Sequence, residues 1–237
     1  MLVAVTRPRP DADDTAAELS ARGHDPIVAP LLTVTIPSDA TLDLDTVQAI
    51  LITSANGARA LAAATDRRDV PVFAVGHASA AAARGCGFDR TESADGDVAA
   101  LAELVASRLS PRDGGLLHVA GSVTAGDLSG MLGSSGFTVR RAVAYRADPV
   151  TVLPPAMTAP LRSGTLGAVL FYSPRTAAQF VKLVAEDSLS EACVGVTAIA
   201  LSQAVADKLA AVPFSDVRIA ESPDQPSLLQ ALDGLNA

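Results

Sequence analysis

The sequence predicts an α/β protein of two similar lobes, each a doubly wound parallel sheet, with nested and discontinuous connectivity. The main observation is an internal repeat. Residues 49–61 (AILITSANGARAL) align without a gap with residues 168–180 (AVLFYSPRTAAQF), and each segment is an apolar strand that runs into Ser and then a helix start. Residues 70–88 match residues 196–214 in the same way. Such alternation of strand and helix is typical of parallel α/β sheets.

The amino-terminal segment is repeated as well, but at a distance. Residues 1–32 resemble residues 116–145, so the repeated segments follow the order A, B, A′, B′. Two lobes could form from A with B and A′ with B′, or from B with A′ and A with B′. Residues 29–37 and 140–149 favour the second, nested pairing, because both are short, alternating and bounded by Pro, as crossover strands should be. The expected boundaries are lobe 1 at 1–32 and 150–237, lobe 2 at 38–140, and a two-stranded linker at 33–37 and 141–149.

Outside the linker, each predicted strand ends where a helix starts. The chain opens on the strand MLVAV, and after Pro10 the acidic run Asp11 to Asp14 favours the first turn of a helix through the helix dipole. The Pro-bounded linker strands carry no helix of their own. The other helix starts follow in chain order at Ser54, Gly76, Asp97, Ser122, Ser173, Ser202 and Gln225.

Composition and charge exclude several classes of protein. At 237 residues the chain is long enough for two lobes of about 110 residues, each with its own core. The longest apolar runs have the length of a strand, well short of the roughly 20 residues of a membrane span, and no signal peptide is visible, so we expect a cytoplasmic protein. A net charge of −8 and an aromatic content of 3% argue against a nucleic-acid surface.

Cysteines and histidines give no catalytic or metal motif. Cys86 and Cys193 lie far apart, without a CxxC, and are interpreted as free thiols of a reducing compartment. His24, His77 and His118 are scattered, so they support neither a zinc site nor a Ser-His-Asp triad. The sequence also has no phosphate-binding loop and no GxGxxG after a strand.

The repeated helix starts predict binding of anions. Unpaired amides at a helix N-terminus bind carboxylates or phosphates, and in open parallel sheets these ends lie at the carboxyl edge of the strands, where ligands bind. Two such edges would line a cleft between the lobes, a usual place for a large small-molecule ligand. The alternative is that Ser54 and Ser173 only cap their helices.

Several segments resemble the uroporphyrinogen-III synthase family. No single segment is diagnostic, but their order and spacing cover nearly the whole chain. The segments are VTRP at 5–8 with Leu19, Gly23, His24 and Pro30–Leu31 after it, TSANGA at 53–58, VGHASA at 75–80, GFTVRRAVAYR at 136–146, and FYSPRTA at 171–177.

This resemblance implies a reaction and a way of binding. The family closes the linear tetrapyrrole hydroxymethylbilane to uroporphyrinogen III, with loss of water and inversion of ring D, through an azafulvene and a spiro intermediate. It is a lyase of porphyrin, heme and other tetrapyrrole biosynthesis, and it uses no metal and no organic cofactor. Its substrate is a polycarboxylate held in the cleft largely by backbone amides, so the resemblance agrees with the repeated helix starts.

The resemblance also implies a proton donor. In the family a Tyr at the end of the A′ segment is the candidate that protonates the departing oxygen, and Tyr145 matches its position. Tyr145 could instead pack against a lobe or only orient the substrate. Tyr172, which stands where Thr is common, offers a second phenol and a rival.

The candidate substrate-binding residues combine the helix starts with the family pattern. They are Thr6, Arg7, Ser54, Ala55, Gly76, Ser79, Asp97, Gly121, Ser122, Arg146, Tyr172, Ser173, Thr176, Ser202 and Gln225. Arg140 and Arg141 are interpreted as solvated surface residues.

Other positions also depart from the family pattern. The loop from Ala120 to Ala125 lacks the Arg that is common there, and Val205 replaces the hydroxyl that Ser79 retains in the first copy. Asp97 and Gln225 stand where Thr is frequent, and Ser227 could serve instead of Gln225 in another alignment.

Other functions and partners stay open at the level of sequence. A non-enzymatic two-lobe protein that binds or senses an organic anion or tetrapyrrole is the main alternative. A tetrapyrrole methyltransferase is a third hypothesis, but the glycine-rich cofactor loop that it needs is missing here. For the synthase we expect a monomer without membrane or nucleic-acid partners, and transient contact with the enzyme that supplies hydroxymethylbilane.

Overall fold

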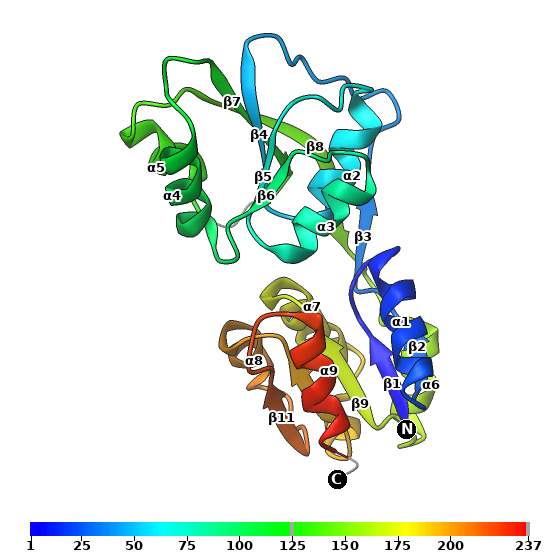
Figure 1. Ribbon diagram of the computed structural model, residues 1–237. Coiled ribbons are helices and arrows are strands. Elements are labelled where there is room, and N and C mark those ends of the chain that lie inside the picture. Colours follow the sequence, from blue (N-terminus) through cyan, green and yellow to red (C-terminus); the bar gives the residue numbers. More distant parts are fainter. Residues whose placement is uncertain (124–125, 236–237) are drawn as a thin grey trace. The chain divides into compact units, whose positions relative to one another are not determined.

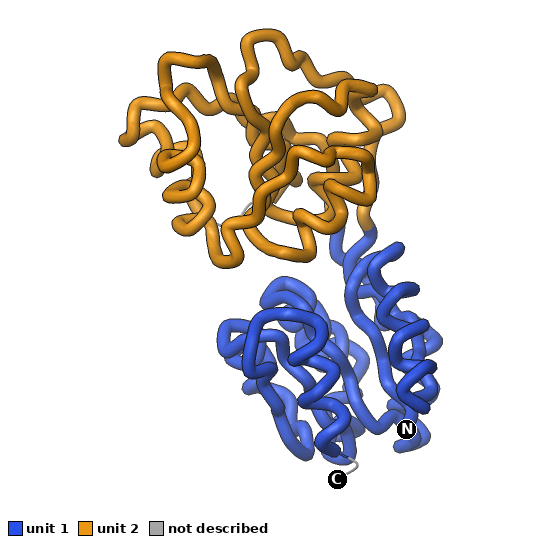
Figure 2. Tube along the Cα trace, in the orientation of Figure 1, with its two compact units in different colours: residues 1–33, 148–237 blue, residues 34–147 orange. Residues whose placement is uncertain are grey.

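The computed structural model describes residues 1–123 and 126–235, and it divides into two compact units (Figure 2). Unit 1 consists of Met1–Thr33 and Asp148–Ala237, and unit 2 of Val34–Ala147. Unit 2 is therefore an insertion in unit 1, and the chain passes between the units twice. Both units contain parallel strands alternating with helices, which confirms the predicted α/β class.

Unit 1 is built on a five-stranded sheet in the order β11-β10-β9-β1-β2 (Figure 1). Each pair of neighbouring strands in it is parallel. Helices α1 and α9 pack on one face, and α6, α7 and α8 on the other. The elements are β1 (Leu2–Val5), α1 (Asp11–Ala21), β2 (Asp25–Val28), α6 (Pro155–Arg162), β9 (Ala168–Phe171), α7 (Pro174–Glu186), the 3₁₀ helix η1 (Ser190–Cys193), β10 (Thr197–Ala200), α8 (Gln203–Leu209), β11 (Asp216–Ile219) and α9 (Gln225–Asp233).

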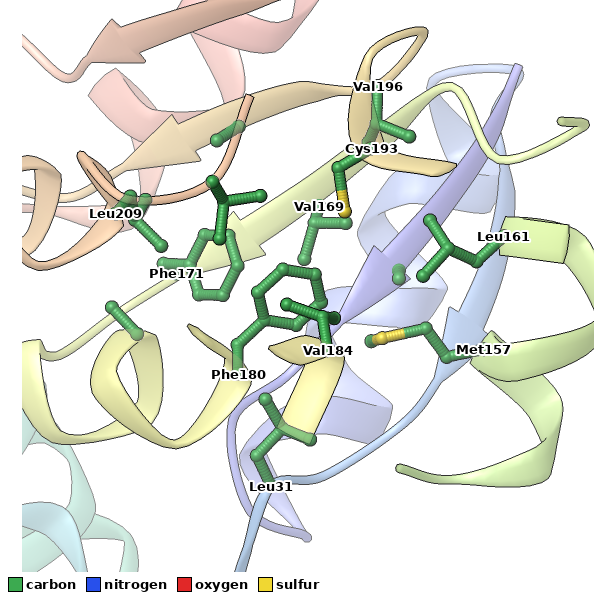
Figure 3. Packing of buried hydrophobic residues seen from close by; sticks show 14 of the residues in the cluster. Leu31, Met157, Leu161, Val169, Phe171, Phe180, Val184, Cys193, Val196 and Leu209 are labelled. Atoms are coloured by element: carbon green, nitrogen blue, oxygen red, sulfur yellow. The ribbon is translucent and has the colours of Figure 1, made fainter. Parts of the chain in front are cut away.

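The core of unit 1 explains why its central strands are apolar throughout. Helices cover both faces of the sheet, so all four residues of β9 are buried. Figure 3 shows Phe171 and Phe180 side by side on the α7 face. Their rings meet edge to face with centroids 5.2 Å apart, and Phe214 stacks on Phe180 at 5.8 Å. These rings fix α7, and with it the helix start that follows β9.

Unit 2 has a six-stranded sheet in the order β3-β8-β7-β4-β5-β6. Helices α2 and α3 pack on one face, and α4 and α5 on the other. The elements are β3 (Leu32–Thr35), β4 (Val47–Ile52), α2 (Ala55–Ala64), β5 (Val72–Ala74), α3 (His77–Gly85), β6 (Thr91–Ser93), α4 (Val98–Arg108), β7 (Gly115–Gly121), α5 (Leu128–Ser134) and β8 (Val139–Pro149). Strands β3 and β8, which pass between the units, are neighbours in this sheet.

A bulge in β8 sets the direction of one side chain. Strand β8 pairs in parallel with β7 from Leu116 opposite Val139 to Ala120 opposite Val143, but the next β7 residue, Gly121, lies opposite Tyr145. Ala144 is thus an extra residue, and it packs with Tyr145 on the α2–α3 face of the sheet. A bulge redirects the side chains that follow it. Without this bulge, Tyr145 would point to the opposite face.

Candidate active site

Helix α2 begins with a side-chain cap at the carboxyl end of β4. Ser54 is extended at φ −159° and ψ 157°, and its Oγ accepts a hydrogen bond of 3.0 Å from the Gly57 amide. Ser54 is therefore a helix cap, as the sequence suggested. Its Oγ also has a second partner.

That second partner is Tyr145. The Tyr145 hydroxyl lies 2.8 Å from Ser54 Oγ, within hydrogen-bond distance. The Tyr145 ring lies against Gly121, so that a Cβ on Gly121 would come within 2.8 Å of the ring. The Ser122 amide donates to the Tyr145 carbonyl at 3.0 Å. Four residues that the sequence suggested from separate segments thus lie together in unit 2.

Arg141 joins this group. It is exposed, as the sequence suggested, and in addition its Nη2 donates to the Gly121 carbonyl at 2.6 Å and to the Ser122 carbonyl at 3.3 Å. A guanidinium therefore lies beside the loop after β7, where the sequence itself has no basic residue. Thr124 and Ala125 of that loop lie outside the described residues. The sequence feature that could have pointed to Arg141 as a site residue is its position on the same predicted strand as Tyr145.

The other helix starts of unit 2 fall into two kinds. Helix α3 follows Gly76, and no side-chain cap is seen there in the described part of the chain; Ser79, in its first turn, is buried. Helix α4 follows Asp97, whose carboxylate accepts the amides of Ala99 and Ala100 at 2.9 and 3.0 Å. The start of α3 therefore keeps amides available for an anion, whereas Asp97 satisfies its own helix end and adds a negative charge.

In unit 1, helix α7 repeats the Ser cap, but no tyrosine contacts this Ser among the residues that the structure describes. Ser173 Oγ accepts the Thr176 amide at 3.2 Å and lies 2.8 Å from Thr176 Oγ1. Thr176 is almost fully buried. Ser202 precedes α8 and, within the described residues, makes no side-chain cap. Thr6 is fully buried and donates to the Leu170 carbonyl at 2.6 Å, so its side chain stabilises the sheet and is closed to a ligand.

Arg7, Tyr172 and Gln225 form a network at the carboxyl end of β1 and β9. The Arg7 guanidinium lies 4.3 Å from the centre of the Tyr172 ring and donates to Gln225 Oε1 at 2.9 Å. It also pairs with Asp11 at 3.3 Å. The Gln225 amide nitrogen donates to Glu18 at 2.7 Å, a contact that no sequence pattern predicts.

The second tyrosine belongs to this network. Within this network the Tyr172 hydroxyl lies 3.5 Å from Thr15 Oγ1. Burial raises the pKa of Tyr172, an effect that Thr15 and Arg7 partly oppose. Arg146, the last of the candidates, is exposed on β8, one residue after Tyr145. Ala55 lies at the first position of α2, next to Ser54.

The described residues give little support to metal or thiol chemistry. Within 1–123 and 126–235, no group of three or more His, Cys, Asp and Glu side chains is arranged to hold a metal ion. Burial raises the pKa of the Cys193 thiol to about 11, which disfavours the thiolate. Among those same residues, no helix combines the length and apolar character needed to cross a membrane.

The comparisons with known proteins agree with the fold. A model of the uroporphyrinogen-III synthase family matches residues 13–230. The structure of uroporphyrinogen-III synthetase from Helicobacter pylori is similar at a TM-score of 0.63 and 14% identity, over 98% of each chain. A mutant uroporphyrinogen III synthase from the extreme thermophile Thermus thermophilus gives 0.57 and 19%, over 100% of this chain and 97% of the other. No curated protein sequence matches the chain.

Proposed function

The chain belongs to the uroporphyrinogen-III synthase family, and we propose that it closes hydroxymethylbilane to uroporphyrinogen III with Tyr145 as the proton donor. The observation that carries this assignment is the Tyr145 phenol, which lies 2.8 Å from the capping Ser54 at the carboxyl edge of the unit 2 sheet. Ligands of open α/β sheets bind at this edge. Tyr145 thus combines a position for ligand contact with a transferable proton.

At its first step the reaction requires one proton from the protein. The bond between the hydroxymethyl carbon and its oxygen breaks, the bonding pair leaves with oxygen, and the Tyr145 proton converts that oxygen to water. The substrate is left as an azafulvene cation beside a phenolate. The ring D carbon that bears the bridge attacks this cation and forms the spiro intermediate. The bond between that carbon and the bridge then breaks and leaves a second azafulvene cation, which the unsubstituted carbon of ring D attacks. That carbon loses its proton, and this proton restores the phenol. Atoms and charge balance over the cycle.

Helix N-termini and guanidinium groups support binding of the substrate carboxylates. The chain carries a net charge of −8, so a polyanion needs local attraction to overcome the overall field. In unit 2 the start of α3 at Gly76 and the Arg141 guanidinium supply it. In unit 1 we assign the same role to the starts of α7 and α8, at Ser173 and Ser202, and to Arg7.

The side chains of Thr6 and Gln225, two residues of the predicted set, are not available for the proposed contacts. Thr6 is fully buried, and the Gln225 amide is engaged by Arg7 and Glu18. Arg146 and Ser79 stay proposals on the basis of their position alone. We also propose a cytoplasmic monomer that takes hydroxymethylbilane from the preceding enzyme, because free hydroxymethylbilane can close directly to the uninverted isomer.

The test supplies freshly generated hydroxymethylbilane to the purified protein without added cofactor. The products are oxidised and the porphyrin isomers are separated. We expect mainly isomer III. If only isomer I formed at the spontaneous rate, with the protein folded, the non-enzymatic binding or sensor function would be the better account.

A further inference from the structure

Ser54 joins a helix end to a phenol. Its Oγ accepts the Gly57 amide at 3.0 Å, which is the cap of α2, and it lies 2.8 Å from the Tyr145 hydroxyl. A serine hydroxyl has one proton and two lone pairs. The amide of Gly57 uses one lone pair, so the contact with Tyr145 uses either the serine proton or the second lone pair.

These two arrangements differ in what Tyr145 can do. If Ser54 donates to the phenol oxygen, the phenol proton stays free to leave toward a substrate. If Tyr145 donates to Ser54, its proton is already used. The positive end of the α2 dipole lies at Ser54 and stabilises negative charge nearby, so it favours the phenolate that remains after Tyr145 gives up its proton, with Ser54 as the donor to it.

We infer that Ser54 is a positioning residue for ring closure, which holds the Tyr145 phenol in place by donating to its oxygen and thereby directs the phenol proton to the substrate. This inference rests on the proposed function and adds the residue that orients the acid. It also changes the role of Ser54, which the sequence suggested as a direct contact to the substrate.

The surroundings restrict Tyr145 to this position. The bulge at Ala144 turns the side chain to the α2 face, and the ring fits only because Gly121 has no Cβ. The Ser122 amide binds the Tyr145 carbonyl from the neighbouring strand. These contacts fix the backbone and the ring plane, and Ser54 holds the hydroxyl itself.

The experiment compares Ser54→Gly, Ser54→Thr, Tyr145→Phe and the double variant Ser54→Gly/Tyr145→Phe. Glycine is accepted at a helix N-cap, so Ser54→Gly removes the hydroxyl with little loss of helix. We expect Ser54→Gly to lower kcat about tenfold with KM nearly unchanged, and Tyr145→Phe to lower kcat about a hundredfold, within the range of a misplaced or missing general acid. Ser54→Thr should restore most of the rate.

The double variant decides between positioning and direct binding. If Ser54 acts through Tyr145, removing its hydroxyl has no further effect once residue 145 is Phe. The isomer III fraction should likewise fall in Ser54→Gly and fall no further in the double variant. Equal losses in both backgrounds, or a change in KM alone, would overturn the inference, as would an unchanged kcat in Ser54→Gly.

The controls distinguish a failure of this inference from a failure of the proposed function and from a folding defect. Asp127→Gly removes a side-chain cap of the same kind in the same unit, where Asp127 accepts the Gly130 amide at 2.9 Å, and it should keep the rate and the isomer ratio. A wild-type protein that forms no isomer III would refute the proposed function. Full activity in Tyr145→Phe, with isomer III formed, would refute only the roles of Tyr145 and Ser54.

Discussion

The two tyrosines of the chain meet different environments. The Tyr145 hydroxyl contacts the cap of α2, whereas Tyr172 is held under Arg7 with its hydroxyl toward Thr15. Burial raises the pKa of Tyr172, and Thr15 and Arg7 partly oppose this effect. The contact of the Tyr145 hydroxyl with the cap of α2 is the geometric reason for proposing Tyr145 as the donor, a choice that the sequence left open. The deciding contacts join residues 91 and 157 positions apart, which no local pattern records.

Gly121→Ala should displace Tyr145. The new Cβ would lie 2.8 to 3.0 Å from ring and hydroxyl atoms, so the ring must shift away from Ser54. We expect kcat to fall about tenfold or more because the acid is misplaced, and the free energy of unfolding to fall by about 1–3 kcal/mol through overpacking. Steady-state kinetics and urea unfolding measure both.

The control for this substitution is Gly133→Ala in α5. A Cβ there meets nothing within 4 Å, and Ala is favoured over Gly in a helix, so activity should stay and stability should rise slightly. An active Gly121→Ala variant with an unchanged isomer ratio would show that the placement of Tyr145 is not critical.

His118 predicts a loss of stability in acid. It is buried on β7, its Nε2 has no hydrogen-bond partner within the described residues, and burial and then Arg141 lower its pKa from 6.5 to about 4. Below pH 6.5 the His118 side chain binds a proton in the unfolded chain but stays neutral in the folded chain down to about pH 4. Stability should therefore fall between about pH 6.5 and pH 4, by about 3 kcal/mol from this group.

Urea unfolding at pH 7.5 and pH 4.5 checks this pH dependence. His118→Leu should lose less stability than wild type over this interval, since its side chain cannot titrate. His77→Asn, which changes an exposed histidine, should behave as wild type. Equal losses in wild type and His118→Leu would contradict the assignment.

At the scale of elements, most helix starts were predictable, but whether their amides are already capped was not. A strand followed by Ser or Gly indicates a helix N-terminus, and α2, α3 and α7 do begin after Ser54, Gly76 and Ser173. The helix start expected at Ser122 is wrong, because α5 begins only at Leu128, after the capping residue Asp127. Whether a helix end is open depends on the rotamer of its first side chain. Asp97 folds back onto its own amides, which sequence spacing does not reveal.

Asp97→Ser tests whether the start of α4 meets the substrate. Ser caps a helix about as well as Asp, so the fold should be kept while one negative charge is removed. We expect KM for hydroxymethylbilane to fall about two- to fivefold, as the loss of one exposed repulsion predicts, with kcat unchanged. An unchanged KM would show that Asp97 does not lie near the bound substrate.

The bulge in β8 could not be predicted from the sequence pattern of that strand. The alternation of RRAVAYR predicts a strand, and β8 is one. Counting by twos from Val139 places Tyr145 on the α4–α5 face, yet the extra residue Ala144 moves it to the α2–α3 face. The pairing partner Gly121 sets this shift, and it is remote in sequence.

At the scale of the whole molecule, the buried clusters are divided between the units. Two apolar clusters lie in unit 1 and two in unit 2, and each is assembled from residues of its own unit. Cooperative unfolding follows shared buried surface, so units with separate cores can unfold in separate steps. The chain should therefore depart from a single two-state transition.

The two tyrosines make this testable, because the chain has no Trp and each unit contains one Tyr. In Tyr172→Phe, tyrosine fluorescence reports unit 2, and in Tyr145→Phe it reports unit 1. We expect Phe180→Ala to shift the urea midpoint of unit 1 alone and Phe88→Ala that of unit 2 alone, each through a loss of about 3–5 kcal/mol. Both rings are fully buried in their own cores. If each substitution moved both signals together, the two cores would form one cooperative unit despite their separation.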